Sequence, residues 1–142
     1  VNNKNIVVFG GNQLRPNLHV KDYANLCEIL LTANSEDIRD EIFNCGYQNM
    51  SIADIAEVVR DIVEEEFPEL GKIGIQTTAS DDNRSYHINS DKITKKLNFK
   101  PKLSVADAVR DLCKAFKRGL LPNSFEDDRY FNVRTMKNKS VS

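Results

Sequence analysis

The sequence predicts an α/β fold, because short apolar runs alternate with segments whose apolar residues recur at helical spacing. Residues 6–9 (IVVF) and 42–46 (IFNCG) are expected to form strands that end at glycines. Residues 52–63 and 105–116 place their apolar side chains on one stripe of a helix, and each segment follows a Ser-x-x-Asp capping box. Repeated strand and helix units of this kind are typical of α/β architectures.

The same signals predict the remaining elements. Residues 21–33 form a helix with apolar residues on more than one side, so it is expected to be buried on more than one face. Residues 73–77 alternate like a half-buried strand, and residues 86–88 (YHI) are a second candidate strand. A short helix is expected to begin after Asn89 or Ser90.

The connecting and terminal segments are predicted to be polar and exposed. Residues 35–41 are interpreted as a polar connector, and the acidic residues 64–66 as solvated. Beyond Pro122 the chain turns polar, with Phe125, Tyr130 and Phe131 as expected docking points, and residues 137–142 are expected to fray.

The composition indicates a folded chain without a general affinity for polyanions. The 142 residues are 40% hydrophobic and 29% charged, which is ordinary for a chain with a folded core. The net charge of −1 gives no electrostatic reason to expect nucleic acid or an anionic membrane as a partner. No apolar run approaches the length of a membrane span, and the N-terminus lacks the layout of a signal peptide. We therefore expect no membrane association.

The cysteines indicate neither a disulfide framework nor a metal site. Cys27, Cys45 and Cys113 are odd in number and widely spaced, and no C-x-x-C occurs. This pattern favours a reducing, cytoplasmic location, and no metal-binding residues are predicted.

Three ordered segments resemble those of extended short-chain dehydrogenases that act on nucleotide sugars. QLRPNLHVKDYANL (13–26) is similar to the family's R-x-x-x-H-V-x-D-x-A stretch, and FNCGYQNMSIADIAEVV (43–59) is similar to its F-N-[VI]-G strand with the following helix. DDNRSYHINSDKITKKLNFKPKLSVADAVRDL (81–112) resembles the D-x-R-x-Y-x-x-[DS]-x-x-K segment near the family's C-terminus. The nucleotide-sugar 4-epimerase and 4,6-dehydratase branches resemble the chain most.

The resemblance implies the C-terminal end of a Rossmann-type fold together with its small α/β substrate-binding lobe. Residues 1–66 would supply the last strand and helix units of the Rossmann-type core, and residues 67–122 the sugar-nucleotide-binding lobe. Residues 123–142 would form a C-terminal tail. In the complete enzyme, as the resemblance implies, a hydride passes from the sugar C4 to NAD, and a 4-keto intermediate is then reduced or dehydrated.

The chain itself is expected to have no catalytic residues. A dinucleotide fingerprint needs spaced glycines between a strand and a helix, whereas Gly10 and Gly11 are adjacent and no third glycine follows them. The family's Tyr-x-x-x-Lys pair is also missing, because the residue four places after each tyrosine is a cysteine, a serine, a serine or an arginine. NAD is thus expected only in the complete enzyme, with a missing N-terminal Rossmann half as the partner of this chain. Since the chain begins with Val1, we expect the native reading frame to extend upstream and to encode both features.

Two arginines are the main candidates for binding a nucleoside-diphosphate sugar. Arg15, held extended by Pro16, and Arg84 stand where the family supplies arginines to the diphosphate, and each lies in a loop beside a predicted strand. Guanidinium groups match phosphate oxygens with paired charge-assisted hydrogen bonds. The alternative is that each arginine forms only a weak surface ion pair.

Three further residues are assigned to the same site. Gln13 and Asn83 are expected to contact ribose or base, although each could simply bond its own turn. Tyr86 is expected either to wall the nucleotide pocket or to pack as an ordinary aromatic residue. His19 and Asp22 are interpreted as structural residues at a helix start, with His19 bonding a nearby carbonyl.

Two hypotheses about function follow. The first is the sugar-nucleotide-binding C-terminal portion of an NAD-dependent epimerase or dehydratase, inactive alone. The second is a free-standing binding or interaction module without catalysis, whose native start would lie near residue 1. The first hypothesis also predicts self-association, because strand edges and apolar faces that normally contact the missing half would be exposed.

Overall fold

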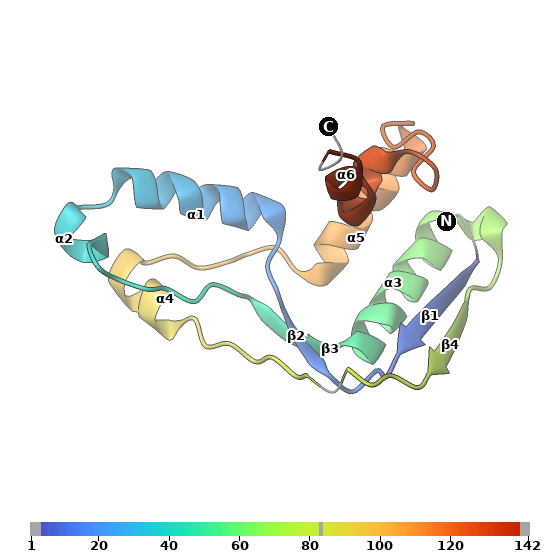
Figure 1. Cartoon of the computed structure of the whole chain (residues 1–142), viewed down its shortest axis with the longest axis horizontal. Coiled ribbons are helices and arrows are strands. Elements are labelled where there is room, and N and C mark those ends of the chain that lie inside the picture. The colour runs from blue at the N-terminus through green and yellow to red at the C-terminus, as the bar shows by residue number, and fades with distance from the viewer. Residues whose placement is uncertain (1–3, 83, 140–142) are drawn as a thin grey trace.

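The computed structural model describes residues 4–82 and 84–139, which form two lobes joined by an antiparallel ribbon (Figure 1). The strands are β1 (Asn5–Phe9), β2 (Leu14–Asn17), β3 (Gln48–Ser51) and β4 (Gly74–Thr78). The helices are α1 (Val20–Thr32), α2 (Ser35–Ile38), α3 (Ile52–Glu66), α4 (Asp91–Leu97), α5 (Val105–Lys117) and α6 (Asn132–Lys139). Two single 3₁₀ turns, η1 (Pro68–Leu70) and η2 (Asp128–Tyr130), complete the set.

The sheet lobe consists of β1, β4, α3 and α5. β1 and β4 pair in parallel, from Asn5 opposite Gly74 to Phe9 opposite Thr78. The helices α3 and α5 are amphipathic, and their apolar sides pack against each other. Phe67 and Ile73, which follow α3 in the chain, complete this core. The buried members of this core are Ile62, Val63, Phe67, Ile73, Val109 and Cys113.

The helical lobe consists of α1, α2 and α4. Its core is small and contains the buried side chains of Leu26, Ile93 and Phe99. The buried carboxylate of Asp22 at the start of α1 accepts hydrogen bonds from the backbone N–H groups of Lys102 and Leu103, at 2.9 and 2.8 Å. One side chain therefore fastens α1 to the segment that leads from α4 to α5.

The ribbon between the lobes is the antiparallel pair β2 and β3. The extended segment that contains residues 86–88 lies beside this ribbon and is held mostly by side chains. Asn49 Nδ2 donates to Ile88 O at 3.1 Å, and Ile88 N donates to Asn49 Oδ1 at 3.0 Å. Gly46 allows a close approach here, because a Cβ at this position would lie 2.6 Å from Ile88 Cδ1 and would require the Ile88 side chain to shift.

Most predicted elements are confirmed. β1, α1, α3, β4, α4 and α5 lie where the sequence places them. The expected burial of α1 on more than one face is wrong, because only Asp22 and Leu26 of this helix are buried and Leu31 is 86% exposed. Ser51 and Ser104 cap their helices, accepting from Asp54 N at 3.0 Å and from Asp107 N at 3.2 Å. At α5 the capping box is complete, because Ser104 N also donates to the Asp107 carboxylate.

The two other predicted strands are wrong. Residues 42–46 are not a strand, because Gly46 N donates to the Ser90 hydroxyl at 2.9 Å instead of to a neighbouring strand, and β3 begins only at Gln48. Residues 86–88 are extended without forming a strand, since Tyr86 N donates to Leu14 O while the next bonds go to the side chain of Asn49.

Three predictions about polar segments also need correction. The connector at 35–41 contains one helical turn, α2. Of the segment expected to fray, residues 137–139 belong to α6, and residues 140–142 lie outside the described residues. The acidic run at the end of α3 is not merely solvated. Glu64 accepts hydrogen bonds from Lys72 Nζ and from Ile73 N, and Glu66 accepts one from Lys117 Nζ at 2.6 Å. These contacts tie α3 to β4 and α5.

The two cores do not divide at residue 66. β1 lies before that position and pairs with β4 after it, while α1 before it shares a core with α4 after it. The assignment of residues 1–66 and 67–122 to two parts of a complete enzyme stays a prediction. Within the described residues, no helix is long and apolar enough to cross a membrane.

One face of the parallel sheet is bare. Ile6 and Val8 point toward α3, whereas Val7 and Phe9 on the opposite face are 46% and 61% exposed. Parallel sheets are normally covered on both faces. The described part of the chain thus supplies one layer of helices to a sheet that could take two.

Candidate functional site

The predicted arginines lie just beyond the carboxyl ends of the two parallel strands. β1 ends at Phe9 and leads through a glycine turn into β2, which carries Arg15. β4 ends at Thr78 and leads into the loop that carries Arg84. Ligands of open α/β sheets commonly bind in this position, outside the carboxyl ends of parallel strands.

The glycine turn is closed by its own side chain and backbone contacts. Gly10 and Gly11 have φ angles of 79° and 119°, a region that favours glycine. The amide of Gln13 spans the turn, because its oxygen accepts from Gly11 N at 2.6 Å and its nitrogen donates to Phe9 O at 2.6 Å. Gly11 O in turn accepts from Ala53 N at 3.0 Å, which joins the turn to the start of α3.

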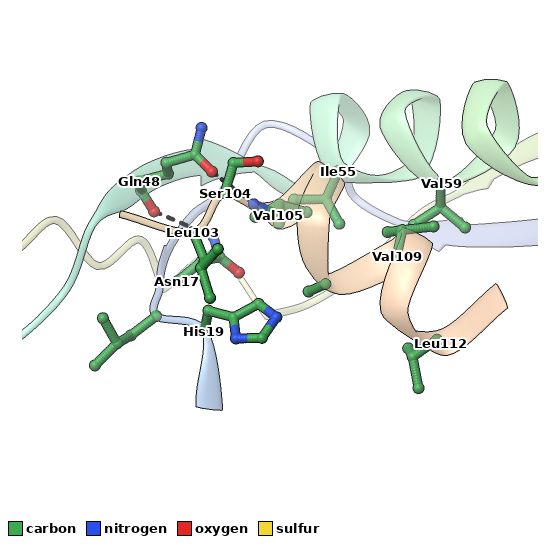
Figure 2. A pocket seen from close by; sticks show the side chains of 12 residues that line it. Asn17, His19, Gln48, Ile55, Val59, Leu103, Ser104, Val105, Val109 and Leu112 are labelled. Carbon is green, nitrogen blue, oxygen red and sulfur yellow. Dashed lines mark hydrogen bonds between the residues drawn. The ribbon is translucent and has the colours of Figure 1, made fainter. Parts of the chain in front are cut away.

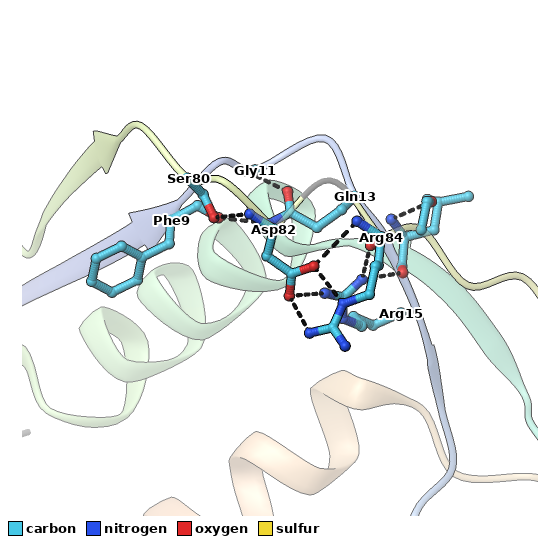
Figure 3. A network of polar contacts seen from close by, with 9 residues as sticks. Phe9, Gly11, Gln13, Arg15, Ser80, Asp82 and Arg84 are labelled. Atoms are coloured by element: carbon cyan, nitrogen blue, oxygen red, sulfur yellow. Dashed lines mark hydrogen bonds and ion pairs between the residues drawn. The ribbon is translucent and has the colours of Figure 1, made fainter.

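Arg15 and Arg84 converge on the carboxylate of Asp82 (Figure 3). Arg84 binds the carboxylate in a bidentate manner: Nε donates to Asp82 Oδ1 at 2.7 Å, and Nη2 donates to Oδ2 at 2.9 Å. Arg15 Nη2 lies 3.5 Å from the same Oδ2. Two guanidinium groups that are 69 positions apart in the chain thus share one anion.

The backbone around these side chains is fixed independently of Asp82. Arg15 Nη1 donates to Arg84 O at 2.6 Å and to Leu14 O at 3.0 Å, so this side chain crosslinks β2 to the loop. The Ser85 hydroxyl accepts from Leu14 N at 2.9 Å, and Tyr86 N donates to Leu14 O at 3.0 Å. The Tyr86 ring lies 5.3 Å from Arg15 Cζ, within range of a cation–π contact.

The electrostatics agree with this geometry. The hydrogen bonds from the Arg84 side chain hold the pKa of the Asp82 carboxyl well below its usual range, and the bond from Arg84 N adds to this effect. The same contact raises the pKa of Arg84. All three groups are therefore charged at neutral pH, which leaves the trio with a net charge of about +1.

A polar hollow of about 300 Å³ adjoins the arginine pair. It is lined by Gly10, Asn12, Gln13, Asp82 and Ser85. A hollow of this size is at the lower end for small-molecule sites. It shares Asp82 with the arginine pair.

A second, apolar hollow of about 220 Å³ lies between α3, α5 and the beginning of α1 (Figure 2). Its polar groups are engaged within the protein: Gln48 Oε1 accepts from Val105 N at 2.7 Å, and His19 Nδ1 accepts from Lys21 N at 3.1 Å. His19 is buried, and its Nε2 lies 3.6 Å from Asp111 Oδ2. His19 thus caps α1 through a backbone N–H, whereas a bond to a carbonyl was expected.

The structure brings together four of the five predicted site residues. Arg15 and Arg84 share the carboxylate of Asp82, and the Tyr86 ring lies against Arg15. Gln13 lines the adjoining hollow, and its amide closes the glycine turn. Asn83 lies outside the described residues. Contact of any of these residues with a ligand stays a prediction.

Sequence reasoning missed Asp82, which joins the two arginines. The available signal was its spacing, because an aspartate two residues before an arginine in a polar loop can accept that arginine's fork. The approach of Arg15 to the same carboxylate cannot be predicted from local sequence, because Arg15 and Asp82 are far apart in the chain.

The fold is that of the C-terminal part of Rossmann-like short-chain dehydrogenases, which confirms the predicted fold class. No family model and no curated protein matches the chain by sequence. Solved structures match by shape at low identity, and they include epimerases and dehydrogenases of the extended short-chain type.

Three of these structures illustrate the likeness. L-threonine dehydrogenase from Phytophthora infestans has a TM-score of 0.66 at 10% identity, over 82% of this chain and 38% of its own. UDP-N-acetylglucosamine 4-epimerase from Bacillus cereus has a TM-score of 0.63 at 17% identity, over 80% of this chain and 38% of its own. RMD from Pseudomonas aeruginosa, solved in complex with NADPH, has a TM-score of 0.61 at 16% identity, over 82% and 36%. The chain thus spans well under half the length of these structures.

Proposed function

We propose that this chain is the sugar-nucleotide-binding C-terminal portion of an NAD-dependent nucleotide-sugar epimerase or dehydratase. The observation that carries the proposal is the convergence of Arg15 and Arg84 on one anion beside a polar hollow, at the carboxyl ends of β1 and β4. A nucleoside diphosphate carries two adjacent phosphates, and each can accept a guanidinium fork. The fold likeness to a UDP-N-acetylglucosamine 4-epimerase supports this class of ligand.

The ligand's phosphates would lie on the two arginines, with the nucleoside or the sugar extending into the adjoining hollow. Gln13 lines that hollow, and Tyr86 flanks Arg15 from the extended segment beside β2. Aromatic faces beside a guanidinium are suited to contact a planar base. Asn83, between Asp82 and Arg84 in the chain, is assigned to the same ligand by the sequence resemblance alone.

NAD is assigned to the complete enzyme, because the glycine turn of this chain does not fit a dinucleotide. A dinucleotide pyrophosphate is held by free backbone N–H groups where a glycine turn opens a helix. Here the turn opens the strand β2, and Gly11 N donates to Gln13 Oε1. We therefore place the NAD site and the catalytic Tyr-x-x-x-Lys pair in a missing N-terminal half, and derive no hydride step from this chain.

The bare face of the sheet supports the existence of that half. Within residues 4–82 and 84–139, β1 and β4 have helices on one face only, and Val7 and Phe9 are exposed on the other. The matched structures are also more than twice as long as the aligned part. The upstream coding sequence tests this point: it should encode a strand-G-x-x-G-x-x-G-helix and a Tyr-x-x-x-Lys, and a native start near residue 1 would contradict it.

Ligand binding is tested by titration calorimetry of the chain with UDP, GDP, ADP and dTDP, because the base is not known. At least one of these nucleotides should bind, and Arg84→Ala should weaken that binding about 10- to 100-fold, as expected for loss of charge-assisted hydrogen bonds. Arg129→Ala is the matched control. Arg129 is also exposed and also forks onto an aspartate two residues before it, Asp127.

The control shows whether the effect is specific. Equal affinities of the Arg84→Ala and Arg129→Ala variants would refute the assignment of Arg84, and absence of binding to all four nucleotides would favour the free-standing interaction module. Circular dichroism of both variants checks that the fold is retained.

We also propose that the isolated chain self-associates through its uncovered apolar surfaces. Val7 and Phe9 lie beside a free strand edge, and unpaired edges with apolar faces seek partners. Analytical ultracentrifugation should detect dimers or larger species, and Phe9→Lys should shift the chain toward monomer. A clean monomer at high concentration would contradict this proposal.

A further inference from the structure

We infer that the Asp82 carboxylate is a built-in competitor for the anion site, which holds the two arginines in the ligand-free chain and leaves them when a diphosphate binds. This inference rests on the proposed function. It adds a residue that lowers the affinity for every phosphate ligand by the same factor, so that a ligand with two linked phosphates still binds with a clear net gain.

The first argument is that Asp82 occupies the Nε–Nη2 edge of the Arg84 guanidinium, which is one of the two edges that can hold a phosphate by paired hydrogen bonds. Both donors of this edge, Nε and Nη2, are engaged by the two oxygens of Asp82. Arg15 Nη2, the group nearest to the same carboxylate, lies 3.5 Å from it. A phosphate that takes the fork of Arg84 must therefore replace this carboxylate, since the same two N–H groups cannot serve both anions.

The second argument is that Asp82 is not needed to hold the site together. The loop is already fastened to β2 by the bond from Arg15 Nη1 to Arg84 O and by the bonds that Ser85 and Tyr86 make with Leu14. The Asp82 side chain is 38% exposed, so water can solvate the carboxylate when it leaves the arginines. It also lines the polar hollow, which gives the incoming ligand access to it.

The third argument concerns the class of ligand. Asp82 is tethered two residues from Arg84, so its effective concentration at that arginine is in the millimolar range or higher. A single phosphate replaces the carboxylate one for one and gains little. Two linked phosphates can engage Arg84 and Arg15 together, which compensates for the lost carboxylate contact.

The experiment compares Asp82→Asn with the unchanged chain in titrations with UDP, UMP and inorganic phosphate. Asparagine keeps an oxygen for the bond from Arg84 N, which is 3.2 Å in the present structure, but removes the negative charge. We expect Asp82→Asn to raise the affinity for UDP about fivefold, the scale of one exposed ion pair, and to raise the affinity for UMP by the same factor. Asp82→Ser is a second variant that also retains a backbone-bonding oxygen.

Asp127→Asn is the control, because Asp127 also accepts Nε and Nη2 of an arginine two residues later, both on its Oδ2, but lies outside the proposed site. This variant should change no affinity. Unchanged or weaker UDP binding by both Asp82 variants would overturn the inference and would assign Asp82 a positioning role. A gain for UDP without a gain for UMP would also overturn it, because displacement costs the same for both. Failure of the proposed function is distinguished by the Arg84→Ala result, which does not depend on Asp82.

Discussion

The two lobes of the molecule are stabilised in different ways. The sheet lobe has a broad apolar core in which two capped helices, α3 and α5, close over each other and over one face of β1 and β4. The helical lobe has a core of three buried apolar side chains and relies on polar side chains that bind backbone groups, above all Asp22. Broad apolar burial spreads stability over many residues, whereas a small core with polar fasteners concentrates it in a few.

The difference also concerns what each lobe leaves open. The sheet lobe leaves one sheet face uncovered, with Val7 and Phe9 exposed, and the proposed ligand site lies at the end of the same sheet. The helical lobe is joined to it by the β2–β3 ribbon and by contacts of His19 and Lys21 with Asp111. Few contacts join the lobes, so we expect them to open separately, and the following variants test that expectation.

The largest effect is expected for Phe99→Ala. Phe99 is 1% exposed in a core of three buried residues, so its truncation should cost about 3–5 kcal/mol of unfolding free energy. Hydrogen exchange should accelerate in α1 and α4 while α3 and α5 remain protected. Phe67→Ala is the counterpart in the sheet lobe, and Phe9→Ala, at an exposed position, should cost little. Equal acceleration in both lobes would show a single cooperative unit.

Asp22→Ala is expected to cost about 2–4 kcal/mol, because it leaves the N–H groups of Lys102 and Leu103 without their acceptor. Asp22→Asn retains an amide oxygen and should lose less. Urea unfolding measures both variants. Should the two substitutions cost the same, the hydrogen bonds would not be the cause.

Ser104→Ala is expected to cost about 1 kcal/mol through loss of the cap of α5, and Ser51→Ala a similar amount at α3. Both helices belong to the sheet lobe, so faster exchange should be confined to it. Thr32→Ala serves as the control, since its hydroxyl bonds carbonyls of its own helix at positions 28 and 29. Loss of protection in α1 after either cap variant would contradict the separation of the lobes.

The smallest effect is expected for the stability of α4 at low pH. Hydrogen bonds from Lys92 and Lys96 lower the pKa of Glu41 from 4.5 to about 2. A depressed carboxyl pKa contributes stability above the unfolded value, and that contribution is lost as pH falls from about 4.5 toward 2. Protection of α4 should therefore decline over this range, and Glu41→Gln should flatten the decline. Glu64→Gln, in the sheet lobe, should leave the α4 profile unchanged.

The success of sequence reasoning depended on how local each signal is. Ser51 and Ser104 cap helices through residues three positions away, so the capping boxes located α3 and α5 correctly. The run at 42–46 predicts a strand because it is short, apolar and closed by a glycine, but a strand also needs a backbone partner, and Gly46 bonds Ser90 instead. That partner lies 44 positions away and leaves no local trace.

The same reasoning explains the candidate site. Arg15 and Arg84 were found through family-like motifs, whereas Asp82 gains its importance only when folding brings Arg15 to it. The bond from Arg15 to Arg84 O spans 69 positions, which no periodicity or capping signal covers. Sites built from single residues of distant segments are therefore the part of the molecule that sequence patterns describe least.

The pairing of β1 with β4 has a consequence for synthesis of the protein. The first residue of β1, Asn5, pairs with Gly74, which is synthesised much later. β1 therefore leaves the ribosome well before β4 exists, and the pairing of these two strands is delayed. During that interval its apolar side chains are exposed in the nascent chain, a state prone to aggregation. Productive expression of this polypeptide should therefore respond to translation rate and to chaperones that shield a lone β-strand.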